Sequence, residues 1–415
     1  MKKNVCILGL VLLCTIIMAA FSPADAPLAQ SGSISVLLPP WAEPPQDLLA
    51  EFQESSGITV ELNIMGWDQI HDKITIAAVT NTAAADVVEI DWSWTNEFLT
   101  AGVMEPLELT DEEKAKFPLY TSFEVDGQVL GLPFVNDFRM AYYNTDHFEQ
   151  AGIEQLPTTW DELVEAALKI KAAGISEYPL SFVLSASEGA GTQLMWMSLS
   201  RTGALFQPDN SLNADNLLDS IAFVNKMLTE DKIIDPAAVS LTDVEADAAF
   251  RAGNHSIIIS GGNMLERANN PEESNVVGKV QGLLIPGANE IRSATFGLPE
   301  GVGITKHSEN KEAARAFIDW YLSEEIQIAM FEKEGGLPSN GDAFSELGDE
   351  GRILGSDILL EQAGYMSSPF PGGVPVWYSE FNGALVQAVN RMGQGSITPE
   401  QVVAEIEQKV NQLNQ

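Results

Sequence analysis

Cysteine is nearly absent from this chain of 415 residues. There are two cysteines, Cys6 and Cys14, and both lie among the first twenty residues. The remainder of the chain therefore has no disulfide and no cysteine nucleophile. The length predicts two or more domains, and a core of that size needs neither a disulfide nor a metal to hold it together.

Basic residues are scarce as well. Lysine and arginine together number 22 against 59 aspartates and glutamates, which gives a net charge of −37 at pH 7. Nucleic acids and anionic membrane surfaces are bound by basic faces, so neither is expected as a partner. Histidine is rare too, and the four histidines show no metal-ligand spacing, so no metal site is predicted. They are His71, His147, His255 and His307.

The familiar catalytic and cofactor motifs are missing. The sequence has no phosphate-binding loop, no glycine-rich dinucleotide fingerprint after a strand, no Gly-x-Ser-x-Gly and no His-Glu-x-x-His. We therefore expect no cofactor. Carboxylates are so numerous that a pair of acids of the glycosidase kind stays open as an alternative.

The first 29 residues have the pattern of a secretory signal peptide. Two lysines precede an apolar run over 5–21, and small residues and prolines follow it. We expect cleavage between residues 24 and 30 and export to the periplasm. Leu12 and Leu13 stand before Cys14 where a lipoprotein signal has small residues, so no lipid anchor is expected. A retained membrane anchor is the alternative, because about 17 apolar residues nearly span a bilayer.

Strands alternate with helices along the rest of the chain. Strand-like runs at 33–38, 58–64 and 86–90 are separated by segments with helical spacing, one of them over about 68–80. This order predicts a mainly parallel sheet covered by helices. The pattern then starts again with strands at 129–134 and 138–144 and a helix that opens at the capping box Thr159-Trp160-Asp161-Glu162. The chain is therefore predicted to be an α/β protein of two lobes.

Five of the eight tryptophans lie in or beside loops that follow expected strands: Trp41, Trp67, Trp92, Trp94 and Trp377. Ligands of open parallel sheets bind outside the carboxyl ends of the strands. A flat ring covers the apolar faces of a sugar, while neighbouring carboxylates and amides accept hydrogen bonds from its hydroxyls. A loop tryptophan is as often structural, but three separate loops of this kind indicate a carbohydrate site.

Several stretches in a fixed order carry a resemblance to a known family. They are Ala-Asp-Val-Val-Glu-Ile-Asp at 85–91, Pro-Thr-Thr-Trp-Asp-Glu-Leu at 157–163, Gly-Gly-Leu-Pro at 335–338, and Trp-Tyr at 377–378 before the helix entry at 395–400. In this order the chain resembles family 1 of the bacterial extracellular solute-binding proteins, the maltose-binding-protein type that serves ABC importers. The resemblance covers nearly all of the chain after the signal peptide.

The resemblance implies a two-lobed periplasmic-binding-protein fold of type II, in which each lobe is a mainly parallel sheet flanked by helices. Solute binds in the cleft, the lobes close, and the closed form docks on the permease subunits of the importer. No bond is made or broken, so the protein is not an enzyme, and a monomer is expected. The implied lobes are 33–136 with 302–340 and 139–298 with 350–415, with crossings near 135–139, 298–302 and 340–351.

The resemblance also implies a set of ligand-binding residues. Asp137 stands seven residues before Asn144, where similar proteins have an acidic sugar ligand at the hinge, and Trp377 resembles the stacking tryptophan of the second lobe. Arg139 either bonds a solute hydroxyl or carboxylate or pairs with an acid. The full set is Trp41, Glu43, Trp67, Asp91, Trp92, Trp94, Asp137, Arg139, Asn263 and Trp377.

The expected solute is a mono-, di- or short oligosaccharide. A cationic solute such as a betaine is the first alternative, because aromatic cages with an aspartate bind ammonium groups. An anionic solute is disfavoured by the shortage of arginine. A glycoside-cleaving enzyme is a further alternative, and so is a receptor whose closed form contacts a signalling partner instead of a permease.

Overall fold

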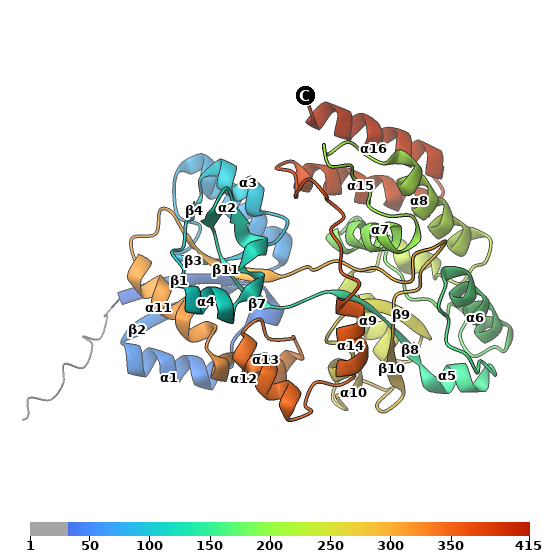
Figure 1. Ribbon diagram of the computed structural model, residues 1–415, viewed down its shortest axis with the longest axis horizontal. Coiled ribbons are helices and arrows are strands. Elements are labelled where there is room, and N and C mark those ends of the chain that lie inside the picture. Colours follow the sequence, from blue (N-terminus) through green and yellow to red (C-terminus); the bar gives the residue numbers. More distant parts are fainter. Residues whose placement is uncertain (1–31) are drawn as a thin grey trace, which may run out of the picture.

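The computed structural model describes residues 32–415. The predicted signal peptide over 1–29 lies outside the described residues. Figure 1 shows two lobes side by side, with β1, β3 and β11 in one lobe and β8, β9 and β10 in the other. The two-lobed α/β architecture is therefore confirmed. Within the described range, no helix has both the length and the apolar character needed to cross a membrane.

The first lobe is built on a six-stranded sheet of order β2-β1-β3-β11-β4, with β7 also paired to β11. The strand β1 lies parallel to both β2 and β3, as the strand–helix alternation predicts. The strand β11 runs antiparallel to β3, β4 and β7. These strands are β1 (Gly32–Leu38), β2 (Ile58–Ile64), β3 (Val87–Asp91), β4 (Met104–Glu105), β7 (Leu132–Val135) and β11 (Glu300–Thr305).

Helices cover both faces of this sheet, and one core lies on each face. The helix expected over 68–80 is observed as α2, and it ends at Asn81 in the left-handed conformation. The helices of this lobe are α1 (Gln46–Ser56), α2 (Trp67–Thr80), α3 (Thr95–Ala101), α4 (Asp111–Lys116), α11 (Lys311–Tyr321), α12 (Glu324–Glu334) and α13 (Gly341–Asp349). A short hairpin of β5 (Glu124–Val125) and β6 (Gln128–Val129) completes it.

The second lobe holds a three-stranded sheet of order β10-β8-β9, formed by β8 (Arg139–Asn144), β9 (Ile257–Gly261) and β10 (Val280–Leu283). Both of its strand pairs are antiparallel, so the prediction of a mainly parallel sheet is wrong for this lobe. The reason is topological: β8 enters from the first lobe, and both of its neighbours come later in the chain and run against it. Parallel pairing here is limited to isolated bridges: Leu180 to Ile234 and to Ile257, Thr159 to Gly287, and Thr295 to Met366.

Helices enclose the largest core of the molecule in this second lobe. The capping box is confirmed at the start of α6, where the Thr159 hydroxyl accepts a hydrogen bond from the Glu162 backbone amide. The helix α7 is buried from Gly189 to Ser200. The helices are α5 (Thr145–Gln150), α6 (Trp160–Ala172), α7 (Glu188–Arg201), α8 (Ala214–Thr229), α9 (Asp243–Arg251), α10 (Met264–Asn269), α14 (Ser356–Ala363), α15 (Tyr378–Gly393) and α16 (Pro399–Leu413).

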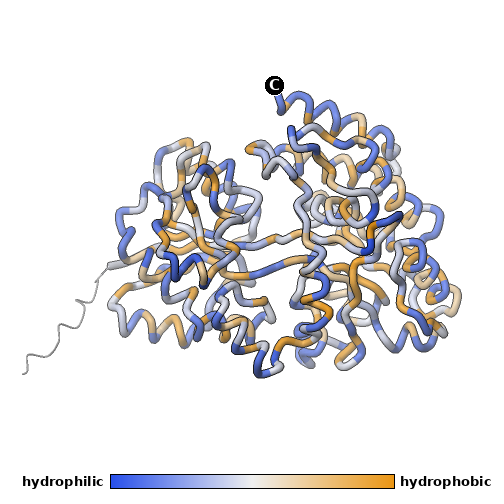
Figure 2. The backbone as a smooth tube through the Cα atoms, in the orientation of Figure 1, coloured by the Kyte–Doolittle hydropathy of each residue, from blue (hydrophilic) through white to orange (hydrophobic). Residues whose placement is uncertain are grey.

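The chain passes between the lobes directly after β7 and again before β11. Hydrophobic residues gather in the strands and inner helices of each lobe, whereas hydrophilic and hydrophobic residues alternate along the outer helices (Figure 2). Because β8 follows β7 after three residues, its first residues lie at the junction of the lobes. This junction is where the candidate site is found.

Candidate functional site

A cavity of about 290 Å³ lies between the lobes. The first lobe contributes the loop after β1, the end of β7, the start of β11 and the end of α12. The second lobe contributes β8, the first turns of α7 and α9, and the residues at the end of β9. A volume at the lower end of the range for small-molecule pockets, about 300–1,000 Å³, fits a small solute.

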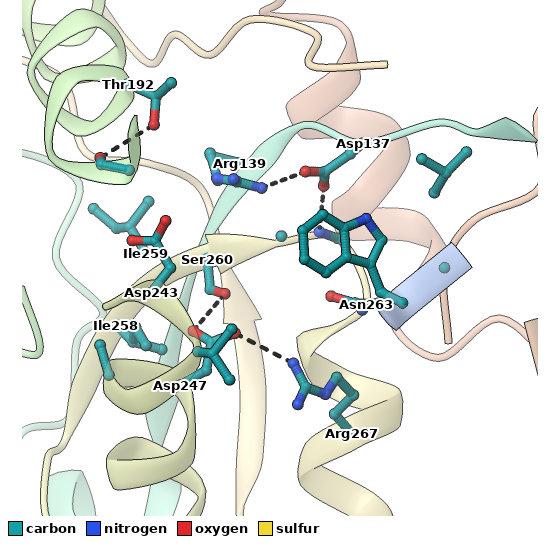
Figure 3. A pocket seen from close by; sticks show the side chains of 18 of the residues that line it. Asp137, Arg139, Thr192, Asp243, Asp247, Ile258, Ile259, Ser260, Asn263 and Arg267 are labelled. Atoms are coloured by element: carbon teal, nitrogen blue, oxygen red, sulfur yellow. Dashed lines mark hydrogen bonds and ion pairs between the residues drawn. The ribbon is translucent and has the colours of Figure 1, made fainter. Parts of the chain in front are cut away.

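Asp137 and Arg139 form an ion pair at the wall where the chain crosses between the lobes. Asp137 also accepts a long hydrogen bond of 3.4 Å from the Gly262 amide. Gly261 leaves room for this pair, because a Cβ atom there would lie 3.1 Å from the Asp137 carboxylate and 3.3 Å from the Arg139 guanidinium. The two side chains point toward one another across the end of β9 (Figure 3).

Two further acids, Asp243 and Asp247, face the cavity from one side of α9 (Figure 3). Asp247 accepts a hydrogen bond of 2.8 Å from the Ser260 hydroxyl and lies 3.5 Å from Arg267. Burial raises the pKa of Asp247 to about 6, and it raises the pKa of Asp243 as well. The surroundings of Asp243 and Asp247 therefore disfavour the ionised form of both side chains.

The same acids act on Arg139. Burial works to lower the pKa of the Arg139 guanidinium, but the carboxylates of Asp137, Asp243 and Asp247 outweigh it and raise the pKa. Arg139 is thus a permanent cation that faces three carboxylates. This arrangement provides both donors and acceptors for a polar solute.

Trp41 supplies an aromatic face to the cavity. It stands in the short 3-10 turn Pro40–Ala42 after β1 and is 37% exposed. Its indole nitrogen donates a hydrogen bond of 2.7 Å to Glu300, the first residue of β11. Phe134 and Phe182 add apolar surface to the lining. Aromatic and apolar surface beside carboxylates is the combination that recognises polyhydroxylated solutes.

Glu300 stands next to a second buried acid, Glu89 on β3. Glu89 is fully buried, and neither carboxyl oxygen meets a hydrogen-bonding partner among the described residues. Burial, reinforced by the nearby Glu300, raises the pKa of Glu89 well above its usual value. Burial also raises the pKa of Glu300. Burial and Glu300 therefore favour the neutral form of Glu89, which stands beside the residue that holds Trp41.

Four of the ten predicted ligand residues line this cavity: Trp41, Asp137, Arg139 and Asn263. Asn263 also bridges the lobes, because its side-chain amide donates to the Glu334 carbonyl oxygen at the end of α12. The remaining six residues lie outside this cavity.

Trp67 and Trp94 line a second cavity of about 280 Å³, and their rings are 4.4 Å apart. From the second lobe this cavity is lined by Glu188 at the start of α7 and by Tyr378 on α15. The Tyr378 hydroxyl donates to Glu188 over 2.6 Å, and burial raises the pKa of Glu188 to about 7. The acid of this second cavity, Glu188, is therefore already engaged by Tyr378.

Three of the other predicted residues are held by their neighbours. Asp91 is buried and accepts hydrogen bonds from the amide and hydroxyl of Ser93. Trp377 packs against Phe206 and Phe381 in the core of the second lobe. Glu43 accepts a hydrogen bond from the neighbouring Gln46 at the surface.

Trp92 follows β3 of the first lobe but packs inside the other lobe. It is 8% exposed, and its ring lies 5.6 Å from Phe296, 5.4 Å from Tyr378 and 6.3 Å from Phe370. Two hydrogen bonds lie close by: Asn96 donates to the Val374 carbonyl oxygen, and the Ser379 hydroxyl donates to Glu97. Trp92 thus forms the centre of a direct contact between the lobes.

Sequence reasoning missed several residues of the cavity. These are Asp243, Asp247, Ser260, Arg267 and Glu300. The acids of α9 have a signal, since they are four residues apart and so share a helix face, but that spacing is equally typical of a solvated surface. Across the described residues, no cluster of three metal-ligating side chains occurs.

Comparison with known proteins identifies relatives that match half or more of the chain. The family model described as "Bacterial extracellular solute-binding protein" matches residues 39–328. A putative binding protein of Brucella abortus is 29% identical over 296 residues, which cover 69% of this chain and 70% of that protein. The sn-glycerol-3-phosphate-binding periplasmic protein of Brucella melitensis is 25% identical over 241 residues, covering 53% of this chain and 51% of that protein.

Solved structures show the same architecture. Maltose-bound MalE3 of T. maritima superposes with a TM-score of 0.80 at 22% identity, covering 92% of this chain and 100% of that chain. A solute-binding protein of an ABC transporter from Agrobacterium vitis, with bound D-mannitol, gives a TM-score of 0.80 at 21% identity and covers 92% and 98% of the two chains. At such identities the likeness shows the fold.

Proposed function

Because the chain belongs to the family of bacterial extracellular solute-binding proteins, we propose that it captures a small carbohydrate between its lobes and delivers it to an ABC importer. One observation carries this proposal: a tryptophan ring and three carboxylates face a single cavity that both lobes enclose. The ring of Trp41 suits the apolar face of a sugar, while Asp137, Asp243 and Asp247 suit its hydroxyls.

The related proteins support this class of solute. Structural relatives carry maltose, D-mannitol, ribitol and α-D-tagatose by their descriptions. We extend that class, neutral sugars and alditols, to this chain. The cavity volume favours molecules of one or two rings over longer chains.

We further propose that binding closes the lobes and that the closed form docks on permease subunits after export to the periplasm. Units of 33–136 with 302–340 and 139–298 with 350–415 would move against each other. A solute favours the closed form only if it touches both units. The cavity supports this, because its lining comes from Trp41 and Glu300 on one side and from α9 on the other.

The test is a thermal-shift and calorimetric panel of monosaccharides, disaccharides and alditols on the purified chain. A binding solute must raise the melting temperature, and the stabilisation must grow with the logarithm of the ratio of its concentration to its dissociation constant. The same samples are assayed for released reducing sugar, since we expect binding without cleavage. If no member of the panel stabilises the chain, carbohydrate capture is wrong, and if reducing sugar is released, the glycoside-cleaving alternative replaces it.

A further inference from the structure

The ion pairs around α9 leave one carboxylate of the cavity without a partner. Arg251 pairs with Glu273 at 2.6 Å, and Arg267 lies between Asp247 at 3.5 Å and Glu273 at 3.7 Å. Arg139 pairs with Asp137. Each guanidinium group is therefore already matched to a carboxylate.

Asp243 is the carboxylate that remains. It makes no hydrogen bond or ion pair with any other residue in 32–415, and it interacts at longer range with Arg139 and with the acids Asp247 and Glu188. The carboxylate of Asp243 nonetheless occupies a defined position against the first turn of α7. A Cβ atom on Gly189 would lie 1.8 Å from its Oδ2 atom, so only glycine leaves room for the carboxylate there. The group faces the cavity beside Asp247 (Figure 3).

We propose that the solute carries a protonated amino group and that Asp243, together with Asp247, binds it. The solute class is thus an amino sugar or an amino alditol, and this inference rests on the proposed carbohydrate function. An ammonium group donates several hydrogen bonds and supplies the positive charge that the cavity lacks. Its polyhydroxylated body lies against Trp41 and exchanges hydrogen bonds with Asp137 and Arg139.

Other solute classes fit the charges less well. A neutral sugar would donate a hydroxyl to Asp243 but would bring no positive charge to a cavity in which carboxylates outnumber arginines. A phosphorylated solute, such as the one named for the Brucella melitensis relative, needs unpaired cations. The two arginines of this cavity, Arg139 and Arg267, are both engaged by acids, and five carboxylates line the same space.

The test uses matched sets that differ in a single substituent: D-glucose, D-glucosamine and N-acetyl-D-glucosamine, the same set on galactose, and D-glucitol with 1-amino-1-deoxy-D-glucitol. Dissociation constants are measured by calorimetry at neutral pH on the full chain. The N-acetyl compounds keep the nitrogen but remove its charge. We expect the amine of at least one set to bind about tenfold more tightly than its neutral partners, or 1.4 kcal/mol.

Two variants locate the effect. Asp243→Asn keeps the size of the side chain and removes its charge, so the affinity for the amine should fall more than the affinity for the neutral partner, and the preference for the amine should drop to about onefold. Glu165→Gln, an equally conservative change at an exposed position of α6 outside the cavity, should keep the preference. The melting temperature of each variant reports whether it is folded, and rising salt should reduce the amine preference in the unchanged chain.

Each outcome of these measurements decides for or against a part of the proposal. Equal or tighter binding of neutral members overturns the amine proposal and leaves carbohydrate capture standing. A preference that survives in Asp243→Asn overturns the assignment to this carboxylate. Binding by no member of any set removes the proposed function and this inference together.

Discussion

The indole nitrogen of Trp41 donates a hydrogen bond of 2.7 Å to the Glu300 carboxylate, although the two residues are 259 positions apart in the chain. Trp41 follows β1 and Glu300 opens β11, the strand that returns from the second lobe. The aromatic wall of the cavity is thus held by the segment that crosses between the lobes. The orientation of the Trp41 ring therefore depends on how strongly the Glu300 carboxylate accepts this hydrogen bond.

The first prediction concerns this hydrogen bond. Trp41→Ala removes the stacking surface and should weaken binding of the best solute of the panel about tenfold or more. Glu300→Gln keeps an acceptor but removes its charge, so a smaller loss of about threefold is expected, because charged acceptors bind more strongly than neutral ones. Calorimetry measures both values.

A matched control for these variants is Trp320→Phe. Trp320 packs against Phe52 with ring centroids 4.8 Å apart, in the core of the first lobe and outside the cavity. Its replacement should leave the affinity unchanged. An affinity of Glu300→Gln equal to that of this control would show that the charge of the acceptor does not affect how Trp41 is oriented for binding.

The second prediction concerns Glu89. A carboxyl group whose pKa is raised on folding binds more protons in the folded state, so its contribution to the unfolding free energy is full below the usual glutamate pKa and is lost as pH rises toward the raised value. Burial and Glu300 raise the pKa of Glu89 in this way. Glu89→Gln should therefore be more stable than the unchanged chain by about 1 kcal/mol or more at pH 8, with a smaller difference at pH 5.

Denaturant unfolding at a series of pH values measures this difference. Glu61→Gln on β2 is the control, because its side chain is exposed and it should shift stability little at any pH. A Glu89→Gln difference that does not depend on pH would show that Glu89 is ionised in the folded chain.

Local patterns were enough to predict the alternating elements and part of the cavity. The capping box at Thr159 and the strand before Asp91 depend on neighbouring residues, so sequence spacing identifies them. Asp137 and Arg139 reach the cavity because Asp137 lies in the crossing after β7 and Arg139 begins β8. The location of such residues can be predicted from their place between consecutive elements of the chain.

The rest depends on contacts that spacing does not encode. Glu300 reaches Trp41 only because β11 inserts antiparallel beside β3. Asp243 and Asp247 are recognisable only once α9 is placed against the cavity, since in a chain with 59 acidic residues the same pair would be taken as a solvated helix face. Trp92 follows a strand as a ligand residue would, yet the facing lobe covers it.

The third prediction concerns Trp92 as a closure contact. Trp92→Ala deletes a ring that is packed among Phe296, Phe370 and Tyr378 of the other lobe. Large-to-small changes of buried aromatic residues cost about 3–5 kcal/mol, and here the loss falls on the closed arrangement. We expect a larger radius of gyration in solution scattering with saturating solute, and weaker binding without loss of any cavity side chain.

Trp320→Ala serves as the control for this variant, because it removes a tryptophan whose ring packs against Phe52, Phe317 and Tyr321 of the first lobe. It should lower the melting temperature while leaving the radius of gyration of the solute-bound form unchanged. Equal radii for the Trp92→Ala variant and the unchanged chain would mean that other contacts hold the lobes together.

The last prediction sets binding against stability at Asp247. Burial raises its pKa to about 6 in the folded chain, so its contribution to the unfolding free energy is full at low pH and is lost as pH rises through about 6. The groups that face it are Ser260, Arg267, Arg139 and Asp243, and the two arginines only partly offset the burial. Asp247→Asn should therefore be more stable than the unchanged chain at pH 8 and nearly equal to it at pH 4.

The same variant should bind the best solute of the panel about tenfold more weakly at pH 8, because a charged acceptor is lost, and the difference in affinity should close as pH falls below 6. Denaturant unfolding and calorimetry on the same samples measure the two effects. Stability and affinity that fall together at pH 8 would show that Asp247 supports the fold instead of the solute.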